Sequence, residues 1–298
     1  MTRREFVGGA AAAVAAAASA VPRPDDLEAW QAETDLVTPV TYRSYLKDGK
    51  TRSFASLEKL EAGFQRVMDE VASCRVTDVP AVWLVYNMGF VVKTPNSLFS
   101  IDLNHRLDVK LAPLLDFALI THNHGDHFRE PFYKAMDGAG KTVISNFKDN
   151  YGAADWRKGG KCWWEGGGYT RAEKVFKIKD VEIRTALTDH NPYLIDFTTT
   201  FEIRVGKWRL FHTGDCGNAA KLSTVWGSPD LWLVFPGCGI NIAAAYRKIK
   251  PKRMAFGHLW ELAHQTGRLT TPMVKAARAK VESLGGTVDI PLWGDRIS

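Results

Sequence analysis

Thr121-His122-Asn123-His124-Gly125-Asp126-His127 follows directly on the apolar run Phe117-Ala118-Leu119-Ile120. Such a run is typical of a buried strand, so the polar stretch should form the loop at the strand's carboxyl end, where open α/β sheets hold their ligands. His122 and His124 are two residues apart and point to the same side of an extended chain, so they can bind one ion. Gly125 lets the chain turn, which brings Asp126 and His127 toward a second ion. The stretch therefore predicts a metal site.

The side chains of this loop also indicate which ions it would bind. Imidazole and carboxylate groups suit zinc, and they also accept manganese or iron. A solvated polar loop is the alternative interpretation. Three of the eight histidines in the chain lie in this one loop, which favours the metal site.

The same loop resembles the H-x-H-x-D-H signature of the metallo-β-lactamase superfamily of hydrolases. Three more positions of that family can be sought at the ends of strand-like runs: His190 comes after residues 181–186, Asp215 after residues 208–211, and His258 ends residues 254–258. The resemblance covers about residues 80–265. It implies an α+β fold, the αββα sandwich of the metallo-β-lactamase type, with its ligand segments at one rim of a sheet.

The resemblance also implies a cofactor of two divalent metal ions, in the first place zinc, with manganese or iron as alternatives. One ion would be bound by His122, His124 and His190. The other would be bound by Asp126, His127 and His258, and Asp215 would bridge the two. A hydroxide between the ions would be the nucleophile, and Asp126 or Asp215 would orient it, so both aspartates are candidate catalytic residues.

Two residues narrow the chemistry within this family. His124 takes the place of the glutamate in the oxygen-reducing di-iron branch, whose pattern resembles H-x-E-x-D. A histidine at this position disfavours oxygen-reducing chemistry. Asp215 supports a bridge between two ions and is unlike the true metallo-β-lactamases. The segment 212–215 looks closest to lactonase-like and phosphodiesterase-like members, so we expect hydrolysis of an ester, lactone or phosphodiester bond. A metallo-β-lactamase acting on β-lactams and a non-catalytic metal-binding protein of the same fold are the alternatives.

Several residues near the ligand loops have supporting roles to test. Asp102 is either the acid with which this family holds a metal-binding histidine or a simple turn residue. We expect His212 to be a packed histidine rather than a ligand, and His105 to lie in a loop near the rim. His264 is a third candidate catalytic residue, as a proton donor or anion contact. Other candidate substrate contacts are Asn191, Tyr193, Asn241 and Trp260, although each of them individually is better explained as an ordinary surface or packing residue.

The first twenty residues form a segment of a different character. Arg3 and Arg4 precede a short Ala-rich stretch that ends in Ala18-Ser19-Ala20. A charged start, a weakly apolar middle and an A-x-A end are typical of a secretory signal, and the paired arginines indicate the twin-arginine type. We therefore expect the twin-arginine export machinery as a partner, cleavage after Ala20, and a periplasmic or secreted location in a bacterium.

The composition of the chain predicts a globular protein. With 298 residues, 45% apolar and 24% charged, it has enough material for one large domain. Residues 21–79 are interpreted as an N-terminal arm with an amphipathic helix, and residues 80–298 as the catalytic domain. Predicted helices cover residues 26–33, 53–71, 130–136, 243–248 and 272–284.

Net charge and cysteine content indicate which ligands and which disulfide bonds the protein could have. Removal of residues 1–20 lowers the net charge from +6 to +5, and the basic residues are scattered. We predict a small-molecule substrate, and a positive rim around the site would attract an anionic one. We expect neither nucleic-acid binding nor stable membrane insertion. The chain has four cysteines, which can pair in three ways or remain free thiols: Cys74, Cys162, Cys216 and Cys238.

Overall fold

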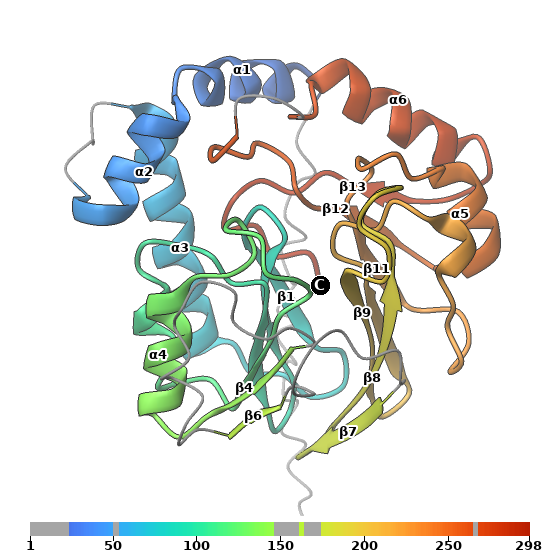
Figure 1. The fold of residues 1–298 in the computed structure, drawn as a ribbon, viewed down its shortest axis with the longest axis horizontal. Helices are drawn as coiled ribbons and strands as arrows, with labels where there is room; N and C mark the ends of the chain where they lie inside the picture. The colour runs from blue at the N-terminus through green and yellow to red at the C-terminus, as the bar shows by residue number, and fades with distance from the viewer. Residues whose placement is uncertain (1–23, 50–53, 146–160, 164–173, 265–267) are drawn as a thin grey trace, which may run out of the picture.

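The computed structural model describes residues 24–49, 54–145, 161–163, 174–264 and 268–298. The expected signal segment, residues 1–20, lies outside the described residues. Two β-sheets face each other at the centre and helices lie on both outer sides (Figure 1). The α+β sandwich predicted from the sequence is confirmed.

The first sheet begins as an antiparallel meander and continues with parallel strands. Its outer edge is extended by the C-terminal segment, where Arg296 forms a bridge with Trp83. The apolar run that precedes the histidine loop is a buried strand in the middle of this sheet. The strand order is β1 (Ala81–Tyr86), β2 (Gly89–Lys93), β3 (Leu98–Ile101), β4 (Phe117–Leu119), β5 (Thr142–Ile144) and β6 (Lys161–Trp163).

The second sheet is antiparallel on one side and parallel on the other. Gly206 and Lys207 form a two-residue hairpin turn between β9 and β10, with φ of 58° at Gly206. From one edge to the other the strands are β13 (Val288–Asp289), β12 (Met254–Phe256), β11 (Leu231–Val234), β10 (Trp208–His212), β9 (Thr198–Val205), β8 (Val181–Thr188) and β7 (Lys174–Ile178).

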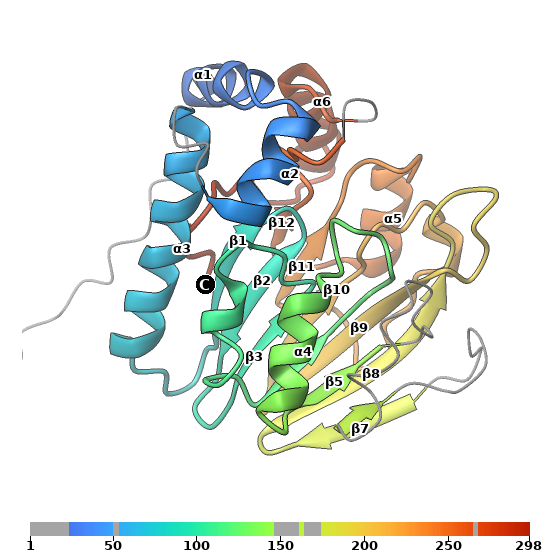
Figure 2. The same cartoon turned by 60° about the vertical axis from the view of Figure 1, so that its left-hand side comes forward.

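The helices cover the two outer faces. Figure 2 shows α3 (Ala55–Ser73) and α4 (Glu130–Gly138) outside the first sheet. The second sheet is flanked by α5 (Ile242–Ile249) and α6 (Thr271–Glu282). Short 3-10 turns, η1 (Asp108–Lys110) and η3 (Ala219–Lys221), complete the connections. Within the described part of the chain, no helix is both long and apolar enough to cross a bilayer.

The N-terminal region contains more structure than the sequence indicated. Besides α1 (Pro24–Asp35), it forms a second helix, α2 (Pro39–Asp48). Thr38 caps α2 by accepting a hydrogen bond from the Thr41 amide at 3.2 Å, and Gly49 ends it in the left-handed region. These helices pack on the body of the protein, since the Trp30 and Trp293 rings meet edge-to-face with centroids 5.1 Å apart.

The four predicted ligand segments follow β4, β8, β10 and β12 at one rim of the two sheets. Hydrogen bonds join the sheets at this rim. The Thr199 amide donates to the Thr121 carbonyl at 2.8 Å, and the His258 amide donates to the Asn87 carbonyl at 2.9 Å. The two halves of the predicted site are therefore held together by main-chain contacts.

Candidate metal centre

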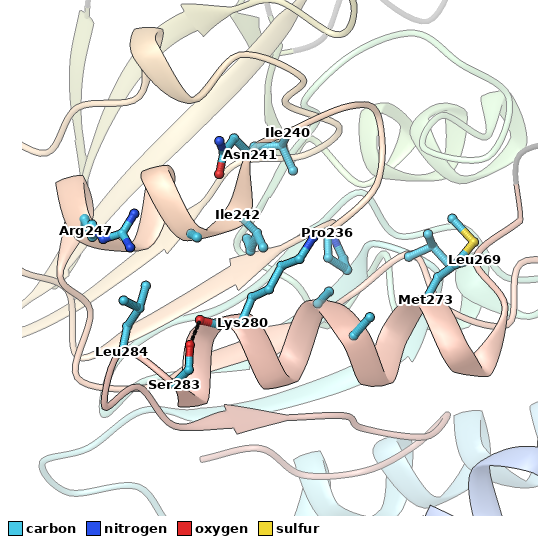
Figure 3. A pocket seen from close by; sticks show the side chains of 13 residues that line it. Pro236, Ile240, Asn241, Ile242, Arg247, Leu269, Met273, Lys280, Ser283 and Leu284 are labelled. Carbon is cyan, nitrogen blue, oxygen red and sulfur yellow. Dashed lines mark hydrogen bonds between the residues drawn. The ribbon is translucent and has the colours of Figure 1, made fainter.

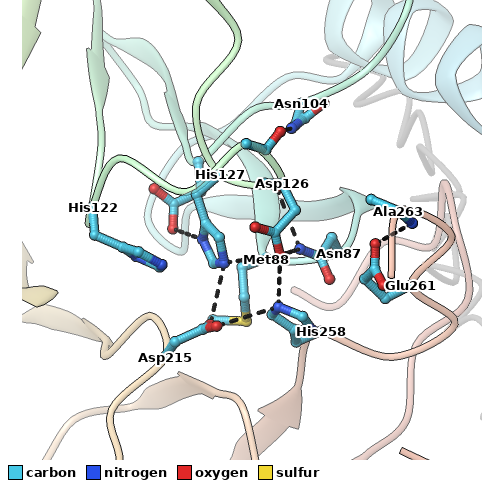
Figure 4. Close-up of polar contacts among 12 residues, drawn as sticks. Asn87, Met88, Asn104, His122, Asp126, His127, Asp215, His258, Glu261 and Ala263 are labelled. Atoms are coloured by element: carbon cyan, nitrogen blue, oxygen red, sulfur yellow. Dashed lines mark hydrogen bonds and ion pairs between the residues drawn. The ribbon is translucent and has the colours of Figure 1, made fainter. Parts of the chain in front are cut away.

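The seven side chains predicted as metal ligands converge in two groups. One group contains His122, His124 and His190, and the other contains Asp126, His127, Asp215 and His258 (Figure 4 labels five of the seven). In each group, one ligand atom per residue lies within 4.8 Å of the others. The first group draws on both sheets, and so does the second.

Asp215 lies between the two groups. Its Oδ1 is 3.3 Å from His127 Nε2, and its Oδ2 is 3.3 Å from His258 Nε2 and 3.5 Å from His190 Nε2. The second group is closed by Asp126, whose Oδ2 is 2.9 Å from His258 Nε2. One carboxylate therefore reaches imidazoles of both groups, which is the position that a bridging ligand requires.

Buried hydrogen bonds fix which ring nitrogen of two histidines faces the centre. His127 Nδ1 donates to Asp102 Oδ2 at 2.9 Å. The Thr121 hydroxyl also donates to Asp102, at 2.6 Å, so its oxygen is left to accept from His122 Nδ1 at 2.9 Å. Both rings therefore turn Nε2 toward the centre, as metal ligands do. Burial alone would lower the pKa of His127, but Asp215, Asp126 and Asp102 raise it well above its usual value, so an ion would replace a proton at this Nε2. Of the two interpretations of Asp102, the contact with His127 favours the supporting acid.

Buried atoms without partners provide a test of whether this centre fits metal ions. His122 Nε2, His127 Nε2, His190 Nε2 and Asp215 Oδ1 are all buried without a hydrogen-bond partner. Such atoms cost free energy unless something satisfies them. Three imidazole nitrogens and a carboxylate oxygen are the donor set that zinc and similar divalent ions accept. The residues present therefore fit the predicted ions.

Electrostatics divides the centre into neutral and charged parts. Burial lowers the pKa of His124 to about 4, with His190 adding to the effect, and burial together with His127 holds the pKa of His122 well below its usual value. Burial alone would also lower the pKa of His258, but Asp215 and Asp126 raise it to about 10. His122 and His124 are thus neutral and can coordinate an ion directly, whereas His258 carries a proton that an ion would replace.

The loops around the centre are supported by residues of both sheets. His212 is fully buried, as predicted for a packed histidine. Its Nδ1 accepts from the Gly214 amide at 3.2 Å, and its Nε2 lies 3.3 Å from the Met88 carbonyl oxygen. His212 therefore holds the turn that presents Asp215.

Two contacts escaped the sequence analysis. Asn87 Nδ2 donates to Asp126 Oδ2 at 3.1 Å from the turn after β1, and Phe235 stacks on the His258 ring with centroids 4.1 Å apart. Nothing in their local sequence distinguishes an asparagine in a turn or a phenylalanine at a strand end from ordinary packing residues. His105 lies in the loop after β3, as expected, but it is fully buried against Phe64, with ring centroids 4.4 Å apart.

The candidate substrate contacts lie in different surroundings. His264 has a 55% exposed side chain whose Nδ1 is 3.2 Å from the buried Glu261 carboxylate. Tyr193 is 91% exposed, whereas Trp260 is buried. The Asn191 side chain accepts from the amides of residues 193 and 194, both at 2.9 Å, so it shapes its own turn.

Asn241 is directed away from the metal centre. It caps α5 by accepting from the Ala244 amide at 3.0 Å and lines a groove of about 830 Å³ between α5 and α6 (Figure 3). This groove also contains Arg247 and Lys280 but none of the seven predicted ligands. The groove and the metal centre are therefore separate features.

Three cysteines with described side chains are free thiols: Cys74, Cys216 and Cys238. Cys162 lies in β6, and its side chain is outside the described part. Cys216 is buried with its Sγ 3.1 Å from Thr188 Oγ1. Cys238 is half-buried, and its Sγ is 3.9 Å from Asp215 Oδ2.

The sequence matches no protein-family model and no curated protein. Solved structures nevertheless share its fold. Igni18, a metallo hydrolase from the archaeon Ignicoccus hospitalis, superposes with a TM-score of 0.54 at 18% identity, over 73% of this chain and 97% of that one. YhfI, a metallo-β-lactamase fold protein from Bacillus subtilis, gives a TM-score of 0.53 at 15% identity over 74% and 99% of the two chains.

A third similar structure performs different chemistry. CmlA, a diiron β-hydroxylase from Streptomyces venezuelae, gives a TM-score of 0.56 at 13% identity, over 74% of this chain and 54% of that one. Together these similarities show that the chain has the metallo-β-lactamase fold, and its structural neighbours include metal-dependent hydrolases of that superfamily. At such low identities the fold is shared, but the reaction has to be argued from the site.

Proposed function

We propose that this protein is a metal-dependent hydrolase that holds two divalent ions, zinc first among them, and cleaves an ester, lactone or phosphodiester bond. The observation that carries the proposal is the position of Asp215 between two groups of buried imidazoles. Its two oxygens lie within 3.5 Å of His127, His258 and His190. The Nε2 atoms of His127 and His190 are buried without a hydrogen-bond partner.

Bound divalent ions would supply a hydroxide at neutral pH and would stabilise negative charge that develops on the substrate. The protein's own residues prepare this chemistry. Asp102 and Thr121 hold the rings of His127 and His122 in the tautomer that exposes Nε2. Asp126 and Asp215 stay ionised, because neighbouring imidazoles outweigh the effect of burial and hold the pKa of each carboxyl well below its usual value. Either carboxylate can accept a proton from the attacking group.

His264 is the group that we assign to leaving-group protonation. The Glu261 carboxylate raises the pKa of His264 through a hydrogen bond, with its charge adding to the effect. Glu261 itself is held rigidly, since the amides of Ala263 and His264 donate to its two oxygens (Figure 4 shows the Ala263 contact). A half-exposed, oriented imidazolium beside the centre is suited to give a proton to a departing oxygen.

A substrate screen tests the function directly. Metal-stripped protein is reloaded with zinc, manganese or iron and assayed with p-nitrophenyl esters, bis-p-nitrophenyl phosphate, lactones and nitrocefin. We expect turnover of one of the first three classes that disappears in Asp215→Asn. Asp78→Asn, which changes an exposed acid remote from the centre, is the matched control and should keep full activity. Hydrolysis of nitrocefin alone would favour a β-lactamase, and inactivity of a fully loaded protein towards every substrate would contradict the proposal.

We also propose that residues 1–20 direct export by the twin-arginine route. Arg3 and Arg4, the Ala-rich middle and the end at Ala20 support this. Export of an already folded protein would let the centre form before transport. Expression in a bacterium should give a periplasmic product that begins at Val21, and Arg3→Lys combined with Arg4→Lys should leave it in the cytoplasm with Met1 or Thr2 as its first residue.

A further inference from the structure

A thiol with no role so far lies at the edge of the candidate metal centre. Cys238 Sγ is 3.9 Å from His190 Nδ1 and 3.9 Å from Asp215 Oδ2. One ligand atom of each of these three residues lies within 4.8 Å of the other two. They form a third group of potential ligands, which shares His190 with the first group and Asp215 with the second.

The main chain holds the thiol in this place. Gly217 packs so tightly against the loops on either side that a Cβ at this position would lie 2.4 Å from the His190 carbonyl oxygen and 2.6 Å from that of Cys238. The Gly217 amide also donates to the Asp189 carbonyl at 2.8 Å. The loops that carry His190, Asp215 and Cys238 are thus in backbone contact, so the fold places the main chain of Cys238 beside both other residues.

Each of the two residues beside the thiol has one buried polar atom without a partner. His190 Nε2 and Asp215 Oδ1 have no hydrogen-bond partner, although these residues are only 9% and 3% exposed. Around a four-coordinate zinc ion, with Zn–S near 2.3 Å and Zn–N near 2.0 Å, neighbouring ligand atoms are about 3.5 Å apart. The 3.9 Å between Sγ and Asp215 Oδ2 is close to this spacing. His190 presents Nδ1 to the thiol at 3.9 Å, so Sγ has to move along the ring toward Nε2 to share the ion.

We propose that Cys238 is a thiolate ligand of the ion held by His122, His124 and His190, and that it makes this half of the centre select thiophilic ions. The proposal rests on the proposed function, because it assumes that the centre binds divalent metals. When the ion binds, the thiol releases its proton to solvent and a sulfur lone pair forms the bond to the metal. A soft thiolate favours zinc over manganese, whereas carboxylate and imidazole ligands alone tolerate both.

Cobalt(II) substitution of the full chain tests the sulfur bond. A thiolate bound to cobalt gives an intense near-ultraviolet charge-transfer band, whereas nitrogen and oxygen ligands give only weak visible bands. We expect the intense band in the wild-type protein and its loss in Cys238→Ser. Cys238→Gly should also lose it, and this variant guards against a folding defect because glycine readily adopts the φ of 53° found at this position.

Cys216→Ser is the matched control. Cys216 is the immediate neighbour of Asp215, but its Sγ lies 3.1 Å from Thr188 Oγ1 and 3.5 Å from the Asn218 carbonyl oxygen. This variant should therefore keep the band. A band that survives in Cys238→Ser would belong to another cysteine and would overturn the proposal.

The remaining outcomes separate this proposal from the proposed function. Weak visible cobalt bands without the near-ultraviolet band would overturn the thiolate ligand and leave the metal centre standing. Failure to take up cobalt or zinc, measured by elemental analysis, would remove both proposals. A second measurement on the wild-type chain uses iodoacetamide and peptide mass mapping: zinc should slow alkylation of the half-buried Cys238, and equal rates with and without zinc would contradict coordination.

Discussion

Asp102 determines how two imidazoles of the centre are presented, although it is not one of the predicted ligands. Its carboxylate is fully buried and accepts from His127 Nδ1 and from the Thr121 hydroxyl, which in turn accepts from His122 Nδ1. It also accepts from the Thr121 amide at 2.7 Å. One side chain thus fixes a ring from each of the two groups.

Replacement of this carboxylate should weaken metal binding. In Asp102→Asn, the amide NH₂ would face either the ring N–H of His127 together with the Thr121 hydroxyl, or the Thr121 amide N–H, so one set of donors loses its acceptor and the rings of His127 and His122 are held less firmly. We expect zinc affinity to fall about 10- to 100-fold, measured by competition with a fluorescent chelator. Asp108→Asn is the control, because this buried acid pairs with Arg129 at 2.7 Å and contacts no predicted ligand. An equal loss of zinc affinity in both variants would contradict the role given to Asp102.

His264 should control the alkaline side of the pH–rate profile. Its raised pKa means that it keeps its proton to a higher pH than a free histidine does, so activity should fall as the pH rises through that value. His264→Ala should lose this alkaline limb and about 100-fold in kcat. Glu261→Gln removes the group that raises the pKa and should move the limb to lower pH. Unchanged profiles in both variants would exclude His264 as the proton donor.

At the scale of residues, the sequence was most informative about the candidate ligands and least informative about their supports. Histidines and aspartates at strand ends stand out because few other roles explain them. Asn87 does not, since its role depends on a 3.1 Å contact with Asp126, 39 positions along the chain. Glu261 does not either, since its contact with His264, three residues on, depends on the turn between them. The sequence also did not indicate where the backbone is strained. Positive φ angles occur at Asp102, Cys238, His258 and Trp260. This conformation costs free energy in residues other than glycine and is often found at functional sites.

Helix α3 is the element that ties the N-terminal region to the sandwich. The apolar residues 57, 60, 64, 67 and 71 form its buried face, as the helical spacing predicts. Midway along, Gly63 lies directly against the C-terminal segment, where a Cβ would be 2.6 Å from the Trp293 carbonyl oxygen. Because these are backbone atoms on both sides, neither partner can give way easily.

This contact predicts opposite effects for two Gly→Ala changes in helices. Gly63→Ala should destabilise the protein by about 1–3 kcal/mol, since it forces α3 and the C-terminal segment apart. Gly138→Ala, at the end of α4, has no atom within 4 Å of the new Cβ and should stabilise by about 0.5–1 kcal/mol through helix propensity. Chemical denaturation of both variants measures the difference. Equal effects would show that α3 does not pack as described.

Elements with strong periodicity could be predicted, and those fixed by local turns or tertiary contacts could not. The helix predicted at residues 53–71 is observed as Ala55–Ser73, and its N-cap, Phe54, makes no side-chain hydrogen bond to the first turn. Helix α2 was missed because its start depends on Thr38 and Pro39 and its few apolar residues give little pattern. The last strand contains only Val288 and Asp289, which is too short for a pattern in the sequence to indicate it.

At the scale of the whole molecule, two buried neutral histidines should make the protein sensitive to acid. Burial lowers the pKa of His105 to about 3, with Arg106 adding to the effect, and burial lowers the pKa of His212 to about 4. Between pH 6.5 and these values the unfolded chain binds more protons than the folded one, so stability rises with pH across this window. Each histidine contributes a slope of roughly 1.4 kcal/mol per pH unit.

Denaturation at pH 4, 5, 6 and 7 tests this dependence. His105→Asn keeps an acceptor for the Leu107 amide, which donates to His105 Nδ1 at 3.1 Å, but it removes the titrating group. The variant should therefore show a shallower loss of stability on acidification than the wild type, whatever its stability at pH 7. Parallel pH profiles of the two proteins would contradict a buried neutral His105.

The largest effect should come from the metals themselves, because the centre joins the two sheets. His122, His124, Asp126 and His127 follow β4 of the first sheet, whereas His190, Asp215 and His258 follow β8, β10 and β12 of the second. Ions shared between these groups would act as a clamp across the sandwich rim. At a free metal concentration 100 times Kd, each ion should add about 2.7 kcal/mol to the free energy of unfolding.

Chelation should therefore lower the Tm of the wild-type protein, and zinc should restore it in a concentration-dependent way. Asp215→Asn should lose most of this response, because the carboxylate common to both groups is gone, while Asp78→Asn should keep it. Hydrogen exchange shows where the clamp acts: removal of metal should speed exchange at residues 121–127 and at 189–190, 214–217 and 257–259 together, and leave β1 and β2 protected. Faster exchange on one sheet alone would mean that the ions do not bridge the two halves, even if the protein binds them.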